Sequence, residues 1–251
     1  MENVRWRGGG GQWGAPRALV RTCDGEEFPA DHVIVTMSLG VLKKSADVLF
    51  SPGLPAHKME AIKLLGMGSV NKIFLEYRKP FWSVGRGSIV LAWSPDELKQ
   101  TSACGSGWTR GITSIDEVPG SRCLLCVSVA GEDACCIEGM SDAALAQSLT
   151  TVLRQFVGDP CLPFPNFIMR SRWTGDPFVR GARSFLSLDS TVGQQCDLGA
   201  PLPDGCGTDD AVLLFAGEAT CPGYYGTVHG ARISGLREAE RILALHRNSG
   251  R

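Results

Sequence analysis

Residues 211–220 read AVLLFAGEAT, an apolar run that ends in Gly217 and Glu218. Residues 221–231, CPGYYGTVHGA, form a turn broken by glycine, and residues 232–247, RISGLREAERILALHR, have the apolar spacing of an amphipathic helix. A strand, a Gly-rich turn and a helix in this order place a helix N-terminus against a bound, electron-rich group. This segment therefore predicts an α/β arrangement with a ligand site beside the last helix.

The rest of the chain alternates between strand and helix patterns. Strand patterns occur at residues 18–23, 31–37, 69–77, 89–93, 124–130 and 166–173. Residues 56–65 and 141–156 have helix patterns, the second capped by Ser141, and residues 38–44 form a short helical or turning segment. Residues 187–209 are rich in Gly, Pro and Asp, which predicts an irregular excursion. This mixture predicts an α/β or mixed α+β, enzyme-like fold.

The composition is that of an ordinary globular protein and excludes several function classes. The 251 residues are 43% hydrophobic and 20% charged, with a net charge of −1, so nothing indicates nucleic-acid or membrane binding. Residues 1–14 are polar and Gly-rich, and no apolar run approaches the roughly 20 residues that a membrane span needs. We therefore expect a cytoplasmic protein, with the nucleus as the alternative compartment.

The cysteines and histidines predict no metal site. Of the ten cysteines, Cys123 and Cys126 form a CxxC, but they fall in a strand pattern, where residues three apart point to opposite faces. Only four histidines occur, and none lies in a cluster with metal-ligand spacing. We expect reduced, mostly structural cysteines.

One Gly-rich stretch matches a dinucleotide-binding motif by letter only. Gly9, Gly11 and Gly14 fit GxGxxG, but the motif needs a strand before it and a helix after it. Residues 1–8 hardly make a strand, and Ala15-Pro16 followed by a strand pattern comes next. We interpret the stretch as a hairpin loop, so the sequence holds no pyrophosphate site of the Rossmann type.

Three blocks together resemble the flavin-dependent amine oxidases, and most closely the animal polyamine oxidases. They are DHVIVTMSLGVLKK (31–44), LGMGSVNKIFLEYRKPFW (65–82) and FAGEATCPGYYGTVHGARISGLREAERI (215–242), with weaker blocks at 171–185 and 201–205 between them. Histone lysine demethylases share the TVHGA…SGLREA wording, but the NKIFLEY and PFW block favours the polyamine branch.

The resemblance implies a cofactor, a domain division and a reaction. It implies FAD and an amine or polyamine substrate, which would be oxidised by hydride transfer to the flavin, with O₂ reoxidising the flavin to give hydrogen peroxide. Residues 1–52 and 211–251 would form part of a Rossmann-like FAD domain, and residues 53–210 a substrate domain with a mixed β-sheet. Since members of the family carry their GxGxxG in an N-terminal portion, the chain looks like a C-terminal half that a complementary half would complete.

The resemblance also assigns the site residues. Lys72 matches the lysine that holds a water against the flavin, where a cation assists reoxidation by oxygen. Residues that match cofactor contacts are Val4, Trp173, Gly217, Glu218, Thr227 and Val228. The Glu218 carboxylate would accept hydrogen bonds from cofactor hydroxyls, whereas His229 at the start of the last helix receives no catalytic role.

The substrate side contains the main departure from the family. Thr227 and Tyr225 match or adjoin substrate positions, but Arg183 stands where the animal enzymes carry an aromatic residue. A guanidinium repels a polycation in a desolvated pocket. Either a one-residue shift lets Phe185 serve, or the substrate is not a polyamine, or the site has decayed. The rival hypotheses are therefore a non-catalytic product that needs its other half, and a lysine-demethylase-like flavoprotein.

Overall fold

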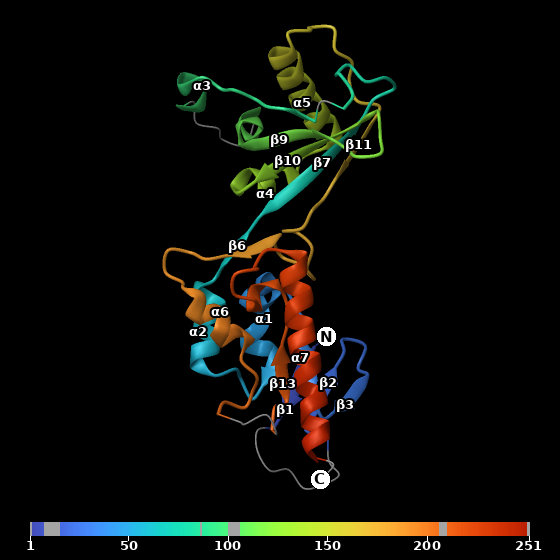
Figure 1. Ribbon diagram of the computed structural model, residues 1–251. Coiled ribbons are helices and arrows are strands. Elements are labelled where there is room, and N and C mark those ends of the chain that lie inside the picture. Colours follow the sequence, from blue (N-terminus) through green and yellow to red (C-terminus); the bar gives the residue numbers. More distant parts are fainter. Residues whose placement is uncertain (1, 8–15, 86, 100–105, 206–209, 250–251) are drawn as a thin grey trace. The chain divides into compact units, whose positions relative to one another are not determined.

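The computed structural model describes residues 2–7, 16–85, 87–99, 106–205 and 210–249. The chain divides into two compact units, unit 1 with Met1–Met67 and Pro177–Arg251, and unit 2 with Gly68–Asp176. In Figure 1, unit 1 holds the blue and red parts of the chain and unit 2 holds the green middle. Each unit is described by itself.

Unit 1 contains a four-stranded sheet in the order β3-β2-β1-β5. Its strands are β1 (Asn3–Trp6), β2 (Ala18–Arg21), β3 (Glu27–Ala30) and β5 (Phe50–Ser51). The expectation that residues 1–8 make no strand was wrong, because Val4 is fully buried and pairs with Val20 on one side and Phe50 on the other. Burial of every second side chain is enough to stabilise even a four-residue strand when it has a neighbour on each side.

A second, two-stranded sheet of unit 1 is parallel. Strand β4 (Val33–Val35) aligns with β13 (Leu213–Phe215), residue by residue from Val33 and Leu213 to Val35 and Phe215. All three residues of β13 are buried, as expected for an apolar run covered on both faces. The carboxyl ends of two chain segments far apart in sequence thus lie side by side.

The α-helices in the described part of unit 1 are α1 (Leu39–Leu49), α2 (Ala56–Leu64), α6 (Val192–Gly199) and α7 (Val228–Ser249). Helix α1 is longer than the short segment that we expected. Helix α6 corrects the prediction of an irregular excursion. Thr191 and Gln194 form a capping box, in which each side chain bonds the backbone of the other, and this offsets the poor helix propensity of the segment.

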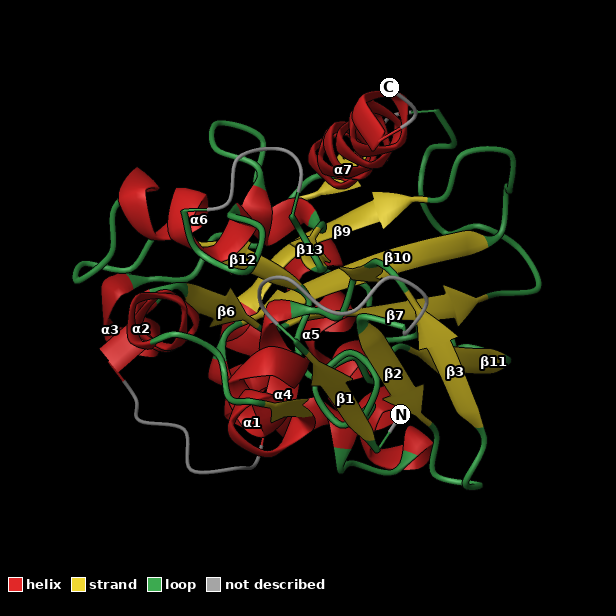
Figure 2. Ribbon diagram, turned by 90° about the horizontal axis from the view of Figure 1, so that it is seen from below, coloured by secondary structure: helices red, strands yellow, loops and turns green. Residues whose placement is uncertain are grey.

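Unit 2 is built on a five-stranded sheet in the order β11-β7-β10-β9-β8, seen with β7, β10 and β9 side by side in Figure 2. The strands are β7 (Val70–Glu76), β8 (Ser88–Ile89), β9 (Ile112–Glu117), β10 (Leu124–Ala130) and β11 (Phe167–Arg170). Every pairing is antiparallel, so the expected mixed sheet was wrong here. The short connection from β9 to β10 permits only an antiparallel neighbour.

The helices of unit 2 are α3 (Pro95–Lys99), α4 (Glu132–Glu138) and α5 (Asp142–Val157), with a 3₁₀ turn, η1, at Ser106–Gly111. Leu145, Leu149 and Leu153 of α5 are completely buried in one core with Ile73 and Leu75 of β7. The side chain of Ser141 accepts from the amide of Ala144, so the predicted cap is confirmed. One sheet face is therefore covered, and residues that alternate with Ile73 and Leu75 lie on the other face.

The boundaries of the units differ from the expected division at residues 52/53 and 210/211. Residues 53–67 and 177–210 belong with the two ends of the chain, because α2 packs on α6 and both contribute to the core around β13. The GxGxxG stretch lies within residues 8–15, outside the described residues. Among the helices that are described, none combines the length and apolar composition that crossing a bilayer requires.

Candidate cofactor site

A cavity of about 330 Å³ opens in unit 1 where the parallel strands β4 and β13 end. Its walls come from the residues that follow the two strands, Thr36 to Ser38 and Gly217 to Thr220, and from apolar side chains such as Met67 and Leu198. In open α/β sheets, ligands bind outside the carboxyl ends of parallel strands. The cavity therefore lies where this topology predicts a ligand.

Gly217 forms a bare backbone edge of the cavity. Its φ of 141° is disfavoured for residues with a side chain. Its amide donates to Ser234 Oγ of α7 at 2.9 Å, and its carbonyl accepts from Thr220 Oγ1 at 2.9 Å. The turn is thus held on both sides, and a ligand can approach its main chain closely.

Glu218 is engaged by groups of the protein itself. Its Oε1 accepts from the Ser184 amide at 3.1 Å, and its Oε2 accepts from Ser184 Oγ at 2.6 Å and from the Gly226 amide. A carboxylate has about four acceptor positions, so one on Oε1 is left. The carboxylate that we expected to bind cofactor hydroxyls fastens strand β12 (Arg183–Phe185) to the turn before α7.

Thr227 caps the helix whose start we expected to face a flavin. Its Oγ1 accepts from the Gly230 amide at 3.1 Å and donates to the Tyr224 carbonyl at 2.5 Å. A Cβ at Gly230 would lie 2.1 Å from that same carbonyl oxygen, so glycine is required there. Val228 follows, with 88% of its side chain exposed.

Strand β12 displays the departure at Arg183. Arg183 and Phe185 are exposed while Ser184 between them is buried, so the first two share one face. Phe185 lies two residues after Arg183, so the strand presents its aromatic ring on the face that Arg183 occupies. Arg183 lies beside Gly226, and Tyr225 is half-buried in the same turn.

Lys72 and Trp173 lie in unit 2. Lys72 is exposed on β7, on the face opposite to the buried Ile73, so it shares the open face with Phe74. The expectation that Trp173 lies in a strand was wrong. Strand β11 ends at Arg170, and Trp173 is 47% exposed on the loop that follows. The other predicted site residues, from Val4 to Val228, lie in unit 1.

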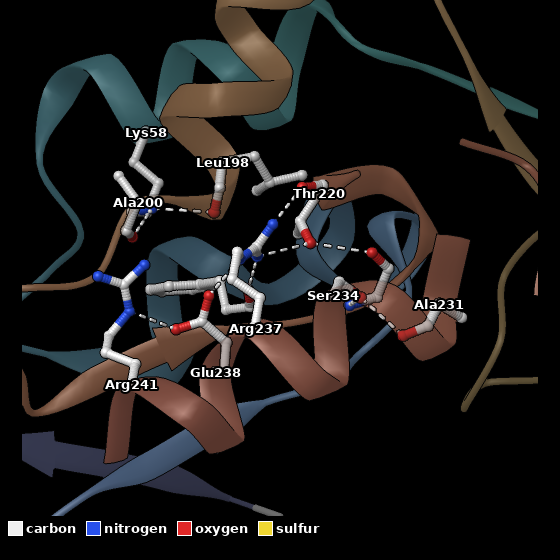
Figure 3. A network of polar contacts seen from close by, with 11 residues as sticks. Lys58, Leu198, Ala200, Thr220, Ala231, Ser234, Arg237, Glu238 and Arg241 are labelled. Carbon is white, nitrogen blue, oxygen red and sulfur yellow. Dashed lines mark hydrogen bonds and ion pairs between the residues drawn. The ribbon is translucent and has the colours of Figure 1, made fainter. Parts of the chain in front are cut away.

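Sequence reasoning missed a buried polar network around Arg237 and Glu238 of α7 (Figure 3). Arg237 of α7 donates to the Phe215 carbonyl at 2.8 Å and to the Thr220 carbonyl at 2.9 Å, and the fully buried Glu238 binds Arg237 and Arg241. These bonds hold the strand β13 and the turn η2 (Glu218–Thr220) on the helix. The network therefore fixes the floor of the cavity.

Lys58 completes this buried network from α2. Its Nζ donates to the carbonyls of Asp197 (2.7 Å), Leu198 (3.0 Å) and Ala200 (2.7 Å) at the end of α6, and lies 4.0 Å from the centre of the Phe215 ring. Burial lowers the pKa of Lys58 to about 7. Its spacing with the buried Ala61 and Ile62 was the sequence signal that could have placed it on the inner helix face.

Known proteins resemble the chain over nearly its whole length. It matches the family described as flavin containing amine oxidoreductase over residues 2–243. The peroxisomal N(1)-acetyl-spermine/spermidine oxidase of Homo sapiens is 43% identical over 88% of this chain and 44% of that protein. The Bos taurus protein of the same name is 39% identical over 98% of this chain and 49% of that protein. This chain belongs to the flavin-containing amine oxidoreductase family.

A solved amine oxidase has the same fold. Putrescine oxidase, in a wild-type structure bound to putrescine, matches with a TM-score of 0.67 at 17% identity, over 97% of this chain and 48% of that chain. The mixed α/β class and the family resemblance are therefore confirmed. The human and bovine relatives are both polyamine oxidases by name. The chain spans about half the length of the relatives that it matches.

The residues present fit part of the flavin dinucleotide that the family description implies. Ligand sites usually measure about 300 to 1,000 Å³, and this cavity is near the lower limit. Its position at two parallel strand ends, its apolar walls and the exposed backbone of Gly217 suit one portion of such a cofactor. Among the residues that the structure describes, no group of three or more His, Cys, Asp or Glu side chains could hold a metal ion.

Proposed function

We propose that the chain supplies one part of the FAD and substrate sites of a polyamine oxidase. The observation that carries this proposal is the cavity at the ends of β4 and β13, with Gly217 at its edge and α7 starting beside it. The chemistry that a bound flavin supplies is acceptance of a hydride equivalent from the carbon next to an amine, with the electrons passing on to O₂.

The residues of the chain have separate tasks in this proposal. Gly217 lets the cofactor approach the main chain, and Thr227 caps the first turn of α7 through the Gly230 amide, at the helix end where negative charge is stabilised. Lys72 supplies a positive charge beside the reacting edge, which favours electron transfer to oxygen. Trp173 offers an aromatic surface against which an apolar ring or chain can pack.

The open sheet face of unit 2 supports a cationic substrate. Asp116 pairs with Cys126, which pairs with Phe74, so Asp116 shares the face of Lys72. Hydrogen bonds from Ser114 and Ser88 lower the pKa of Asp116, and the charge of Lys72 acts in the same direction. A stable carboxylate there suits a second ammonium group, which is why we favour polyamines despite Arg183.

We further propose that a second polypeptide segment completes unit 1. Within the ranges that the structure describes, the sheet of β4 and β13 has two strands, and Ile34 of β4 is partly exposed although apolar. Ile233, Leu236 and Leu243 of α7 are exposed along one helix face. An open parallel edge and an apolar helix face suit a segment that adds a further strand and covers the helix.

The test uses the chain alone and co-purified with the N-terminal half of the human relative. We expect visible flavin absorbance in the complex, and hydrogen peroxide production from N¹-acetylspermine. Lys72→Met should slow flavin reoxidation far more than it weakens flavin binding, whereas Lys79→Met, an exposed lysine after the same strand, should change neither. A complex without flavin, or one that leaves amines unoxidised, contradicts the proposal.

A further inference from the structure

Asn71 is a fully buried polar residue directly beside Lys72. Its Nδ2 donates to the Ala134 carbonyl at 2.9 Å and to Glu138 Oε1 at 2.6 Å. Its Oδ1 accepts from Ser171 Oγ at 2.9 Å and from the Trp173 amide at 3.2 Å. A carboxamide has two donors and two acceptor positions, so all four are used.

Glu138 of α4 holds the rest of the same loop. Its Oε1 accepts from the Thr174 amide at 2.9 Å, and its Oε2 accepts from the Gly175 amide at 2.7 Å. A loop usually leaves its amides to water. Here two side chains from β7 and α4 fix them, and the loop has a defined position on the sheet.

Ser171 connects this loop to the backbone of Lys72. The Lys72 amide donates to Ser171 Oγ at 2.9 Å, and the Ser171 amide donates back to the Lys72 carbonyl at 3.0 Å. The loop that these bonds immobilise nevertheless carries Trp173, with its indole half-exposed. A fixed backbone that presents a large aromatic side chain to solvent is typical of a binding surface.

We propose that Asn71 and Glu138 are positioning residues that set the spacing between Lys72 and Trp173. This inference rests on the proposed function, in which both of those side chains face the flavin. Asn71 itself points to the helix-covered side of the sheet and contacts neither ligand. It acts through the bonds of its Oδ1 to Ser171 and Trp173, which fix the Trp173 loop on the strand that carries Lys72.

A reciprocal exchange of side chains tests the network. Asn71→Asp removes both donors and puts a second carboxylate against Glu138, whereas Asn71→Asp with Glu138→Gln restores a donor between the two positions at unchanged volume. In the full chain, we expect hydrogen exchange at the amides of Trp173, Thr174 and Gly175 to rise about tenfold or more in Asn71→Asp. The double variant should recover protection at Trp173 and Gly175 but not at Thr174, because the new amide nitrogen at position 138 replaces the Oε1 that accepts from the Thr174 amide.

Two further variants keep the comparison interpretable. Ser171→Ala removes one bond to Asn71 and one from the Lys72 amide, so it tests the same network if Asn71→Asp fails to fold. Glu76→Gln, at an exposed position on the same strand, should leave exchange in the loop unchanged. Equal loop exchange in wild type, Ser171→Ala and Asn71→Asp would overturn the proposal, as would a double variant no better than Asn71→Asp.

A kinetic measurement distinguishes positioning from mere stability. In the flavin-loaded complex, Asn71→Asp should slow reoxidation of the flavin by oxygen at least tenfold while its reduction by amine changes less, and the double variant should restore the ratio. Parallel loss of both rates would show a general structural role and refute positioning. A wild-type complex without flavin refutes the proposed function instead, and the exchange comparison then decides alone whether Asn71 fixes the loop.

Discussion

Replacing Lys58 by methionine should remove a pH-dependent contribution to the stability of unit 1. The ammonium is fully buried on three carbonyls at the end of α6, and methionine fills a similar volume without a charge. Burial lowers the pKa of Lys58 from 10.5 to about 7 in the folded chain. The unfolded chain therefore holds one more proton than the folded chain between these two pH values.

The sign and the magnitude follow from this difference in bound protons. Where the unfolded state binds more protons, the free energy of unfolding rises with pH, by about 1.4 kcal/mol per pH unit for one proton. At pH 7 the folded chain is half protonated, so the gain from pH 7 to pH 9 is about 2 kcal/mol. Below pH 6 both states carry the proton, and the contribution of Lys58 no longer changes.

Urea unfolding followed by circular dichroism at pH 6, 7, 8 and 9 measures this contribution. The free energy of unfolding of wild type minus that of Lys58→Met should rise from pH 7 to pH 9, because other titrating groups cancel in the difference. Lys63→Met, at an exposed position of the same helix, is the matched control and should give a flat difference. A flat or falling difference for Lys58→Met would refute the assignment of a buried, pKa-shifted amine.

Three further substitutions test Gly217 and the hydrogen bonds that hold Glu218 and the start of α7. Gly217→Ala should destabilise the chain by roughly 1–3 kcal/mol because φ is 141°, whereas Gly53→Ala, at ordinary φ in open space, should be nearly neutral; thermal melts compare them. Thr227→Val should lose about 1 kcal/mol with the cap of α7, and Thr227→Ser should retain most of it, so equal melting temperatures would disprove the cap. Ser184→Ala leaves Glu218 short of a donor and should lower stability by about 1–3 kcal/mol in the same assay; an unchanged midpoint would show that the clamp is dispensable.

The elements that sequence patterns predicted best are those with a cap and a clear period. Helix α5 has Ser141 at its start and an unbroken apolar stripe, and residues 124–130 match β10 at both ends. In these segments local propensity and burial favour the same structure. Sequence patterns also predicted the last strand and helix, and the family resemblance added their roles, which depend on glycines in the turn between them.

Composition gave a wrong prediction for the segment of α6, where a helix cap outweighs the poor average helix propensity of the residues. Residues 187–209 look irregular because Gly, Pro and Asp are frequent, but Thr191 and Gln194 satisfy the first amides of α6. The Thr-x-x-Gln spacing is a known helix-start signature and was present in the sequence. At the end of the same helix, Lys58 from another helix binds the last carbonyls, and no local pattern indicates that partner.

Lys72 and Asn71 show why family resemblance and an assignment of every buried hydrogen bond identify different residues. Neighbours on a strand point to opposite faces, so Lys72 reaches the open face while Asn71 enters the core between buried Ile73 and the α4 helix. Resemblance to a family identifies the residue whose chemistry faces the ligand. The buried neighbour becomes visible only when each of its donors and acceptors is assigned, because an amide buried at such a position is costly unless it is fully bonded. Since Asn71 lies on the Lys72 strand and its partners belong to the Trp173 loop and α4, the burial of Asn71 is best explained by the need to hold these three segments in one arrangement.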